Sequence, residues 1–129
     1  MKIKITVSAG EIIDKITILE LKASRMKDSS KVLAAIKELN ELSPALKKII
    51  SADKKKITVL KQKLFNVNSR LWNIENSIRK FEGKKDFGKN FTTMARSVYV
   101  QNDKRAALKN KINELTGSHI TEVKEYNKY

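Results

Sequence analysis

The side chains best suited to ligand recognition in this chain are the arginines between residues 70 and 105. Four of the five arginines lie there, at Arg70, Arg79, Arg96 and Arg105. A guanidinium recognises carboxylates and phosphates by donating two parallel hydrogen bonds. Arginines gathered on one surface would therefore form a pocket for an anionic ligand. The same stretch supplies further candidates for that pocket: Glu75, Tyr99, Asn102 and Asp103.

Other kinds of chemistry have few side chains to carry them. The chain has no cysteine, which excludes disulfides, thiol nucleophiles, iron-sulfur clusters and cysteine-based zinc sites. Its single histidine, His119, cannot form a histidine-rich metal site. The segment GKKDFGK, at 83–89, lacks the spacing of a phosphate-binding loop. We therefore expect no catalytic residues, no metal, no cofactor and no enzymatic activity.

A polar segment, QNDKR at 101–105, interrupts the apolar periodicity of the chain around it. Three interpretations are open. The segment could form a polar layer that holds two helices in register at some cost in stability. Asn102 or Asp103 could instead cap a new helix at a bend in the chain. In the third interpretation, the segment forms one wall of the arginine pocket.

The first element that must position these residues is a long helix. Apolar residues repeat at alternating spacings of three and four from Ile57 to Phe81, as on a coiled-coil seam, and Gly83 ends the run. The pattern predicts a helix at about 54–82. Phe65 and Trp72 lie beside the seam and indicate a second buried edge, so this helix should contact two neighbours.

A second long helix is predicted at about 88–116, where the apolar periodicity resumes and Gly117 provides the stop. Because the turn between the two helices is short, they should form an antiparallel hairpin. Counting residues outward from the turn places Asn102 and Asp103 opposite Asn68. The polar interruption would then face a polar part of the first long helix.

Two shorter helices should precede the hairpin. Ser8 and Glu11 form a capping box, so a helix should begin at Ala9 and end near 28–30. One polar cluster on it is interpreted as a solvated face: Asp14, Lys15, Thr17 and Glu20.

The next helix should run over 31–42 and restart or kink at Ser43-Pro44 before continuing to about 50. KIKITV, at 2–7, alternates polar and apolar residues, which suits a short strand or an extended arm. The C-terminal tail allows one docked turn or a strand beside KIKITV. The predicted fold is thus an all-α helical bundle, built on the long hairpin, in a single domain of residues 1–129.

The formal net charge of +14 is concentrated in residues 54–85, where ten basic residues stand against two acidic ones. Nucleic acid or another polyanion is therefore an alternative partner. The lysines that would contact it are Lys54, Lys55, Lys56, Lys61, Lys63, Lys80, Lys84 and Lys85. No apolar run approaches the length of a membrane span, so we expect a cytoplasmic protein without a membrane partner.

Three stretches together resemble an uncharacterised family of small helical proteins of bacteria and phages. They are GEIIDKITILELK at 10–22, VNSRLWNIENSIRKFE at 67–82 and FTTMARSVYVQNDKRAALKNKINELTGSHITE at 91–122. The resemblance implies an α-helical domain of this size and no particular activity. The residues that match its motifs include Glu11, Asp14, Lys15, Trp72, Glu75, Arg79, Arg96, Tyr99, Asn102, Asp103 and Arg105.

A weaker similarity links IDKITILELKASRMK, at 13–27, to the first helix of the helical chorismate mutases. It implies a small-anion-binding enzyme, but no acidic-x-x-Arg-Glu arrangement follows downstream. The favoured hypothesis is a non-catalytic helical-bundle binding or assembly protein, whose partner is another protein or a second copy of itself. The long seam with its second aromatic edge motivates this hypothesis, because such a surface can bury a partner helix.

Overall fold

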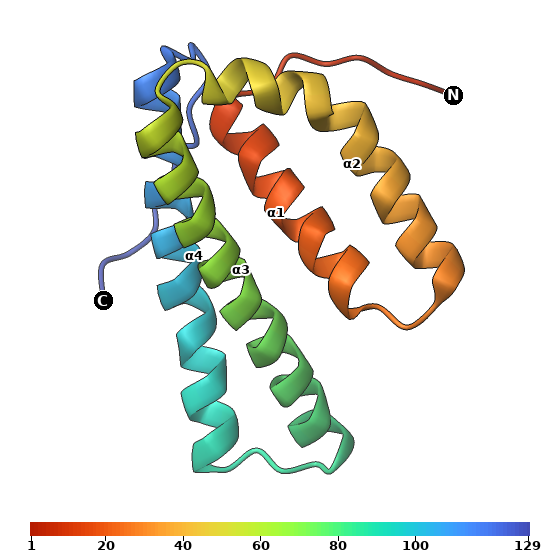
Figure 1. The fold of residues 1–129 in the computed structure, drawn as a ribbon. Helices are drawn as coiled ribbons and strands as arrows, with labels where there is room; N and C mark the ends of the chain where they lie inside the picture. Colours follow the sequence, from red (N-terminus) through yellow and green to blue (C-terminus); the bar gives the residue numbers. More distant parts are fainter.

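The computed structural model describes residues 1–129 as an all-α protein of four helices without any β-strand (Figure 1). The helices are α1 (Ala9–Arg25), α2 (Ser29–Ile50), α3 (Lys54–Gly83) and α4 (Lys89–Thr116). The all-helical prediction is confirmed. None of the helices combines the length and the apolar character that crossing a membrane requires.

Side-chain caps set where three of the four helices begin, α1, α2 and α3. The Ser8 hydroxyl accepts a hydrogen bond from the Glu11 amide at 3.2 Å, which confirms the predicted start of α1 at Ala9. Asp28 accepts from the Ser30 amide at the start of α2, and Asp53 accepts from the Lys56 amide at the start of α3. The Ser8 bond explains why the start of α1 could be predicted from sequence, whereas α2 begins at Ser29, two residues before its predicted start.

Neither predicted interruption ends a helix. Helix α2 continues through Pro44 to Ile50, so a restart at Ser43-Pro44 is wrong, whereas the alternative of a kink there stays a prediction. Ala35 and Ile49 are buried on either side of the proline, and their packing offsets the hydrogen bond that proline cannot donate. Helix α4 likewise continues through 101–105, so neither Asn102 nor Asp103 caps a new helix.

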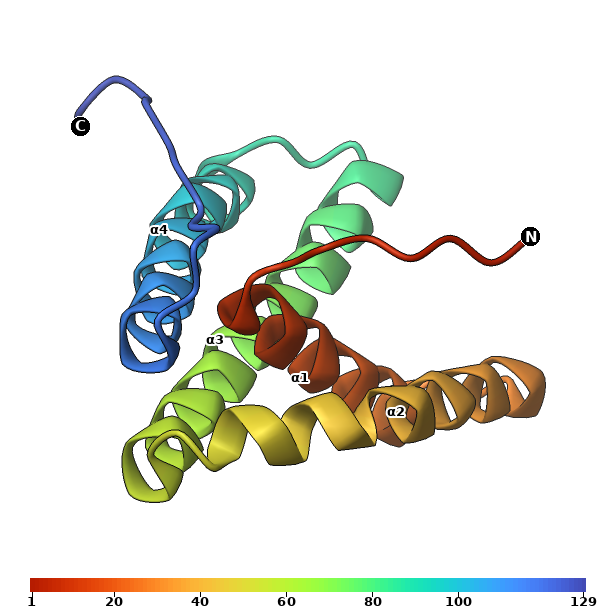
Figure 2. The same cartoon turned by 90° about the horizontal axis from the view of Figure 1, so that it is seen from above.

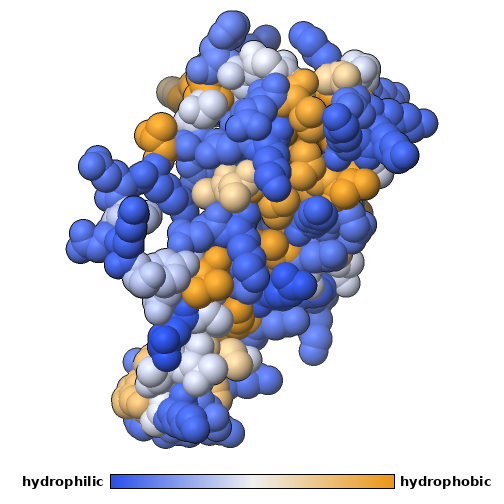
Figure 3. Space-filling view, turned by 90° about the vertical axis from the view of Figure 1, so that its left-hand side faces the viewer, coloured by the Kyte–Doolittle hydropathy of each residue, from blue (hydrophilic) through white to orange (hydrophobic).

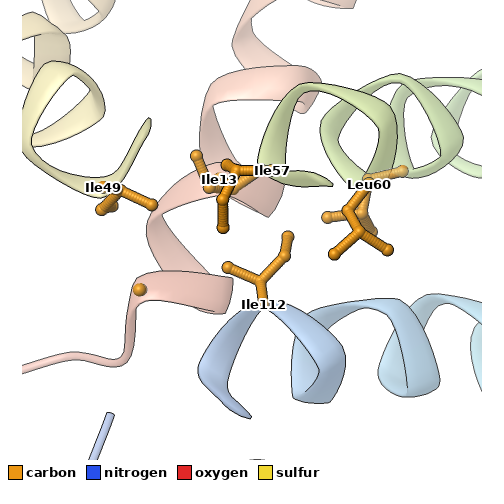
Figure 4. Close-up of a cluster of buried hydrophobic side chains, with 7 residues drawn as sticks. Ile13, Ile49, Ile57, Leu60 and Ile112 are labelled. Carbon is orange, nitrogen blue, oxygen red and sulfur yellow. The ribbon is translucent and has the colours of Figure 1, made fainter. Parts of the chain in front are cut away.

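The four helices form two arms that meet at one end of the molecule. The first arm comprises α1 and α2, and the second comprises α3 and α4 (Figures 1 and 2). A core cluster joins the arms where the N-termini of α1 and α3 meet the C-termini of α2 and α4 (Figure 4). Its members are Ala9, Ile13, Ile49, Ile57, Leu60, Leu64 and Ile112. Away from this junction the arms diverge.

The divergence leaves the far end of the second arm less well covered. On α3, Ile57, Leu60 and Leu64 are buried near the junction, whereas Ile78 and Phe81 are only partly buried. Figure 3 shows a band of hydrophobic side chains that runs between hydrophilic ones on one face of the molecule. The structure therefore retains apolar surface outside its core.

The two termini do not pair as strands, contrary to the pairing that the sequence allowed. Residues 1–7 extend away from the helices and are exposed (Figure 2). The C-terminal tail instead lies along α4, where the Asn110 side chain donates to the Glu122 carbonyl at 3.1 Å and accepts from its amide at 3.2 Å. The backbone of Glu122 thus obtains its partners from a helix side chain and not from a neighbouring strand.

Candidate functional site

A buried carboxylate, Asp14, connects three helices. Its side chain belongs to α1 and is 1% exposed. Its Oδ1 accepts a hydrogen bond from Arg105 Nε of α4 at 2.9 Å and another from Asn68 Nδ2 of α3 at 2.9 Å. Arg105 Nη2 donates to the second oxygen, Oδ2. The arginine fork and carboxylate are thus paired edge to edge, the strongest geometry available to these groups.

Thr17 completes the arrangement one turn after Asp14. Its hydroxyl donates to the Asp14 carbonyl at 2.7 Å and accepts from Asn68 Nδ2 at 2.9 Å. Both residues lie on the α1 surface that faces α3 and α4, so the interpretation of this cluster as a solvated face is wrong for them. Lys15 and Glu20 do remain nearer to solvent and form ion pairs with Glu38 and Lys61.

Lys109, one turn after Arg105 on α4, forms ion pairs with two further carboxylates. It is 6% exposed, and its Nζ lies 2.8 Å from Glu11 and 2.7 Å from Glu122 of the tail. Burial opposes the charge of Lys109, but hydrogen bonds to Glu11 and Glu122 outweigh it and raise the pKa of the ammonium above its ordinary value. The hydrogen bond to Asp14 likewise raises the pKa of Arg105. Both side chains are therefore held as cations.

Sequence reasoning did not select Lys109 or Glu122. The available signal was the four-residue spacing from Arg105 to Lys109, which places both on one face of α4. That spacing alone does not say which neighbouring helix the face meets.

A close approach of two backbones holds this network together. The Gly10 amide donates to Asn113 Oδ1 at 2.7 Å. A β-carbon at Gly10 would overlap the carbonyl oxygen of Lys109. Glycine is therefore needed for α1 to come this near to α4, and the contact sets Asp14 within reach of Arg105.

A cavity of about 470 Å³ opens beside the network, between α1, α3 and α4. It contains four of the eight predicted ligand-binding residues: Glu75, Arg79, Asn102 and Arg105. Asn68 and Trp72 also line it. Asn102 thus shares a cavity with Asn68, the residue that it was predicted to face across the hairpin.

The other predicted pocket residues lie elsewhere. Tyr99 stacks edge-on against Tyr129 with ring centres 5.0 Å apart, and Asp103 accepts from the Tyr129 hydroxyl at 2.8 Å. A second cavity lies between this part of α4 and the C-terminal tail, and Tyr99, Asn102 and Asp103 line it. Arg70 and Arg96 are exposed and line neither cavity. The reason is helical geometry: residues 98, 102 and 105 follow one face of α4, whereas 96, 99 and 103 follow another.

The lysines expected to contact a polyanion all lie on the second arm. Lys61 is half-buried and pairs with Glu20 at 2.6 Å. Lys56 and Lys85 lie 3.9 and 4.0 Å from Asp53 and Glu82. The others are exposed and have no ion-pair partner: Lys54, Lys55, Lys63, Lys80 and Lys84. No group of three or more metal-ligating side chains occurs in the structure.

Four helices in two arms, with a buried ion-pair network at their junction, define a small all-helical protein. The chain belongs to DUF6165, a family of unknown function whose sequence profile matches residues 1–129. This membership agrees with the resemblance to an uncharacterised domain. No curated protein and no solved structure matches the chain.

Proposed function

We propose that the protein is a non-catalytic helical assembly protein that binds a second copy of itself. The observation that carries the proposal is its accessible surface of 9429 Å². A compact monomer of 14.7 kDa should expose roughly 6,900 Å². The protein therefore exposes about 2,500 Å² more than a compact monomer of its mass. The extended ends of the chain contribute part of this excess, and the diverging arms contribute the rest. A homodimer of the obligate class buries about 1,000–2,500 Å² on each partner.

Charge favours the first arm as the surface that meets the second copy. Residues 9–50 contain eight basic and six acidic residues, a net charge of +2. Residues 54–116 contain 16 basic and five acidic residues, a net charge of +11. Two second arms would repel each other strongly, whereas two first arms can approach at little electrostatic cost.

Helix α2 supplies the apolar contact on that arm. Leu33 is 66% exposed and Ile36 is 41% exposed, and their spacing of three places them on one face of the helix. Large apolar side chains that stay exposed together favour a protein contact. In the proposed dimer, the α2 helices of the two copies pack through these residues.

Light scattering after size exclusion tests the proposal. We expect a mass twice the 14.7 kDa of the chain, and we expect the double variant Leu33→Glu/Ile36→Glu to halve it. Val59→Glu is the matched control, because Val59 is 49% exposed but lies on α3 of the second arm. This control should keep the mass of the unaltered protein. A chain that elutes as a monomer across the micromolar range would contradict the proposal.

The net charge of +11 on residues 54–116 favours a second candidate function, the binding of nucleic acid or another polyanion by the second arm. For this function we expect affinity for double-stranded DNA or RNA to fall steeply with salt, as measured by fluorescence anisotropy. Changing Lys54, Lys55 and Lys56 to Glu should weaken binding and reduce the magnitude of the salt slope by about 2–3. The matched control Lys31→Glu/Lys37→Glu alters the first arm. Binding that is equally impaired by both variants would reject the assigned surface.

The proposed setting is the bacterial or phage cytoplasm, without a membrane partner and without a cofactor. The resemblance to bacterial and phage proteins supports a bacterial or phage origin. The two candidate functions are compatible, because the first arm would bind the second copy and the second arm would bind the polyanion.

A further inference from the structure

We propose that the cavity between α1, α3 and α4 binds a small, neutral, planar ligand that carries an N–H donor beside a carbonyl acceptor, as a ring lactam does. This site is separate from the proposed dimer contact on α2. Three features of the cavity specify the ligand: an acceptor without a partner in the protein, a fixed donor and apolar lining residues.

Asn68 provides the acceptor. It is 5% exposed, and both of its amide hydrogens are used, one by Asp14 and one by Thr17. Because a carboxylate only accepts hydrogen bonds, Nδ2 must face Asp14 and Oδ1 must face away from it. Oδ1 accepts no hydrogen bond from the protein, and Asn68 lines the cavity. A ligand N–H would supply a donor to this oxygen, which has no partner in the protein.

Arg105 provides the donor. Asp14 holds its guanidinium through Nε and Nη2, whereas Nη1 makes no hydrogen bond with the protein. Its charge is already balanced by Asp14, and that of Arg79 by Glu75 at 3.4 Å. Such a site suits a neutral carbonyl oxygen better than the anion expected from the arginines alone, because an anion would add an unbalanced charge. Asn102 also lines the cavity and offers a further side-chain amide.

Apolar side chains also line the cavity, among them Trp72, Leu71 and Val98. A flat ring can stack against the indole of Trp72. The volume of about 470 Å³ lies within the range of small-molecule sites and leaves room for a bicyclic compound.

Nuclear magnetic resonance titration tests the site, with 2-quinolone as the probe. Trp72 is the only tryptophan, so its indole N–H gives a single signal that reports on the cavity directly. We expect 2-quinolone to shift this signal saturably. N-methyl-2-quinolone, which lacks the donor, should bind about tenfold more weakly, because it leaves the Asn68 oxygen unpaired. The anion 2-naphthoate should also bind more weakly than 2-quinolone.

Val98→Phe should fill part of the cavity and weaken 2-quinolone binding about tenfold, with an unchanged circular dichroism spectrum. Tyr99→Phe, on the neighbouring face of α4, is the control and should bind as the unaltered protein does. An unshifted Trp72 signal overturns the proposal. It is also overturned if N-methyl-2-quinolone or 2-naphthoate binds as tightly as 2-quinolone, or if Val98→Phe binds normally.

Discussion

Asp14→Ala should lower the free energy of unfolding by about 3–5 kcal/mol, as measured by chemical denaturation. The substitution removes the carboxylate that pairs with Arg105 and accepts from Asn68. Arg105 would keep its charge in a partly buried position, and Asn68 would lose one of its acceptors. Total stabilities are about 5–15 kcal/mol, so this single change could remove a large part of the folded population.

The adjacent ion pair supplies the control. Lys15 pairs with Glu38 at 2.8 Å, but both side chains are well exposed to solvent. Lys15→Ala should therefore change the free energy of unfolding by less than about 1 kcal/mol. If Asp14→Ala were as mild as Lys15→Ala, the network around Asp14 would not stabilise the junction of the arms. The double variant Asp14→Leu/Arg105→Met should recover stability relative to Asp14→Ala, because it leaves no buried charge unpaired.

Gly10→Ala should lower the free energy of unfolding by about 2–4 kcal/mol. The new β-carbon would overlap the Lys109 carbonyl oxygen and lie 2.8 Å from Asn113 Oδ1. Helix α1 would have to move away from α4, which would lengthen the Gly10 to Asn113 hydrogen bond. This cost exceeds the gain of about 1 kcal/mol that alanine normally brings to a helix.

Gly83→Ala is the matched control for this substitution. Gly83 is the last residue of α3, and a β-carbon there would meet nothing within 4 Å. Its substitution should leave the protein unchanged or stabilise it by up to about 1 kcal/mol. Thermal unfolding followed by circular dichroism compares the two variants directly. Equal melting temperatures for Gly10→Ala and the unaltered protein would show that α1 and α4 are not in close contact at Gly10.

Prediction from sequence succeeded where the deciding interactions are local. The Ser8 cap and the uninterrupted apolar seam of α3 predicted the start of α1 and the extent of α3, because each depends on residues within a few turns. At Pro44 it left a restart and a kink open, and only the restart is wrong; the packing of α2 against α1 lies outside any local pattern. Asp14 was misjudged for the same reason: a carboxylate normally marks an exposed face unless a partner on another helix neutralises it.

Prediction of the candidate site likewise succeeded for single residues and failed for contacts between helices. The arginines and the polar segment at 101–105 were identified as the residues able to recognise a ligand, and Asn102 does lie in one cavity with Asn68. Their grouping into a single pocket was not correct, because neighbouring polar residues on α4 alternate between two faces. Lys109 and Glu122 were missed because their partners are distant in sequence.

The sequence by itself determined that the chain is helical, where most helices begin and end, and that it cannot perform cysteine or histidine-rich metal chemistry. Only the tertiary structure decided that the helices diverge as two arms, that Asp14 and Lys109 are buried between them, and which two arginines line the cavity. Caps and periodicity act over one or two turns, and they specify each helix separately. The crossing and rotation of helices depend on contacts between residues far apart in the chain, such as Gly10 with Lys109 and Asp14 with Arg105.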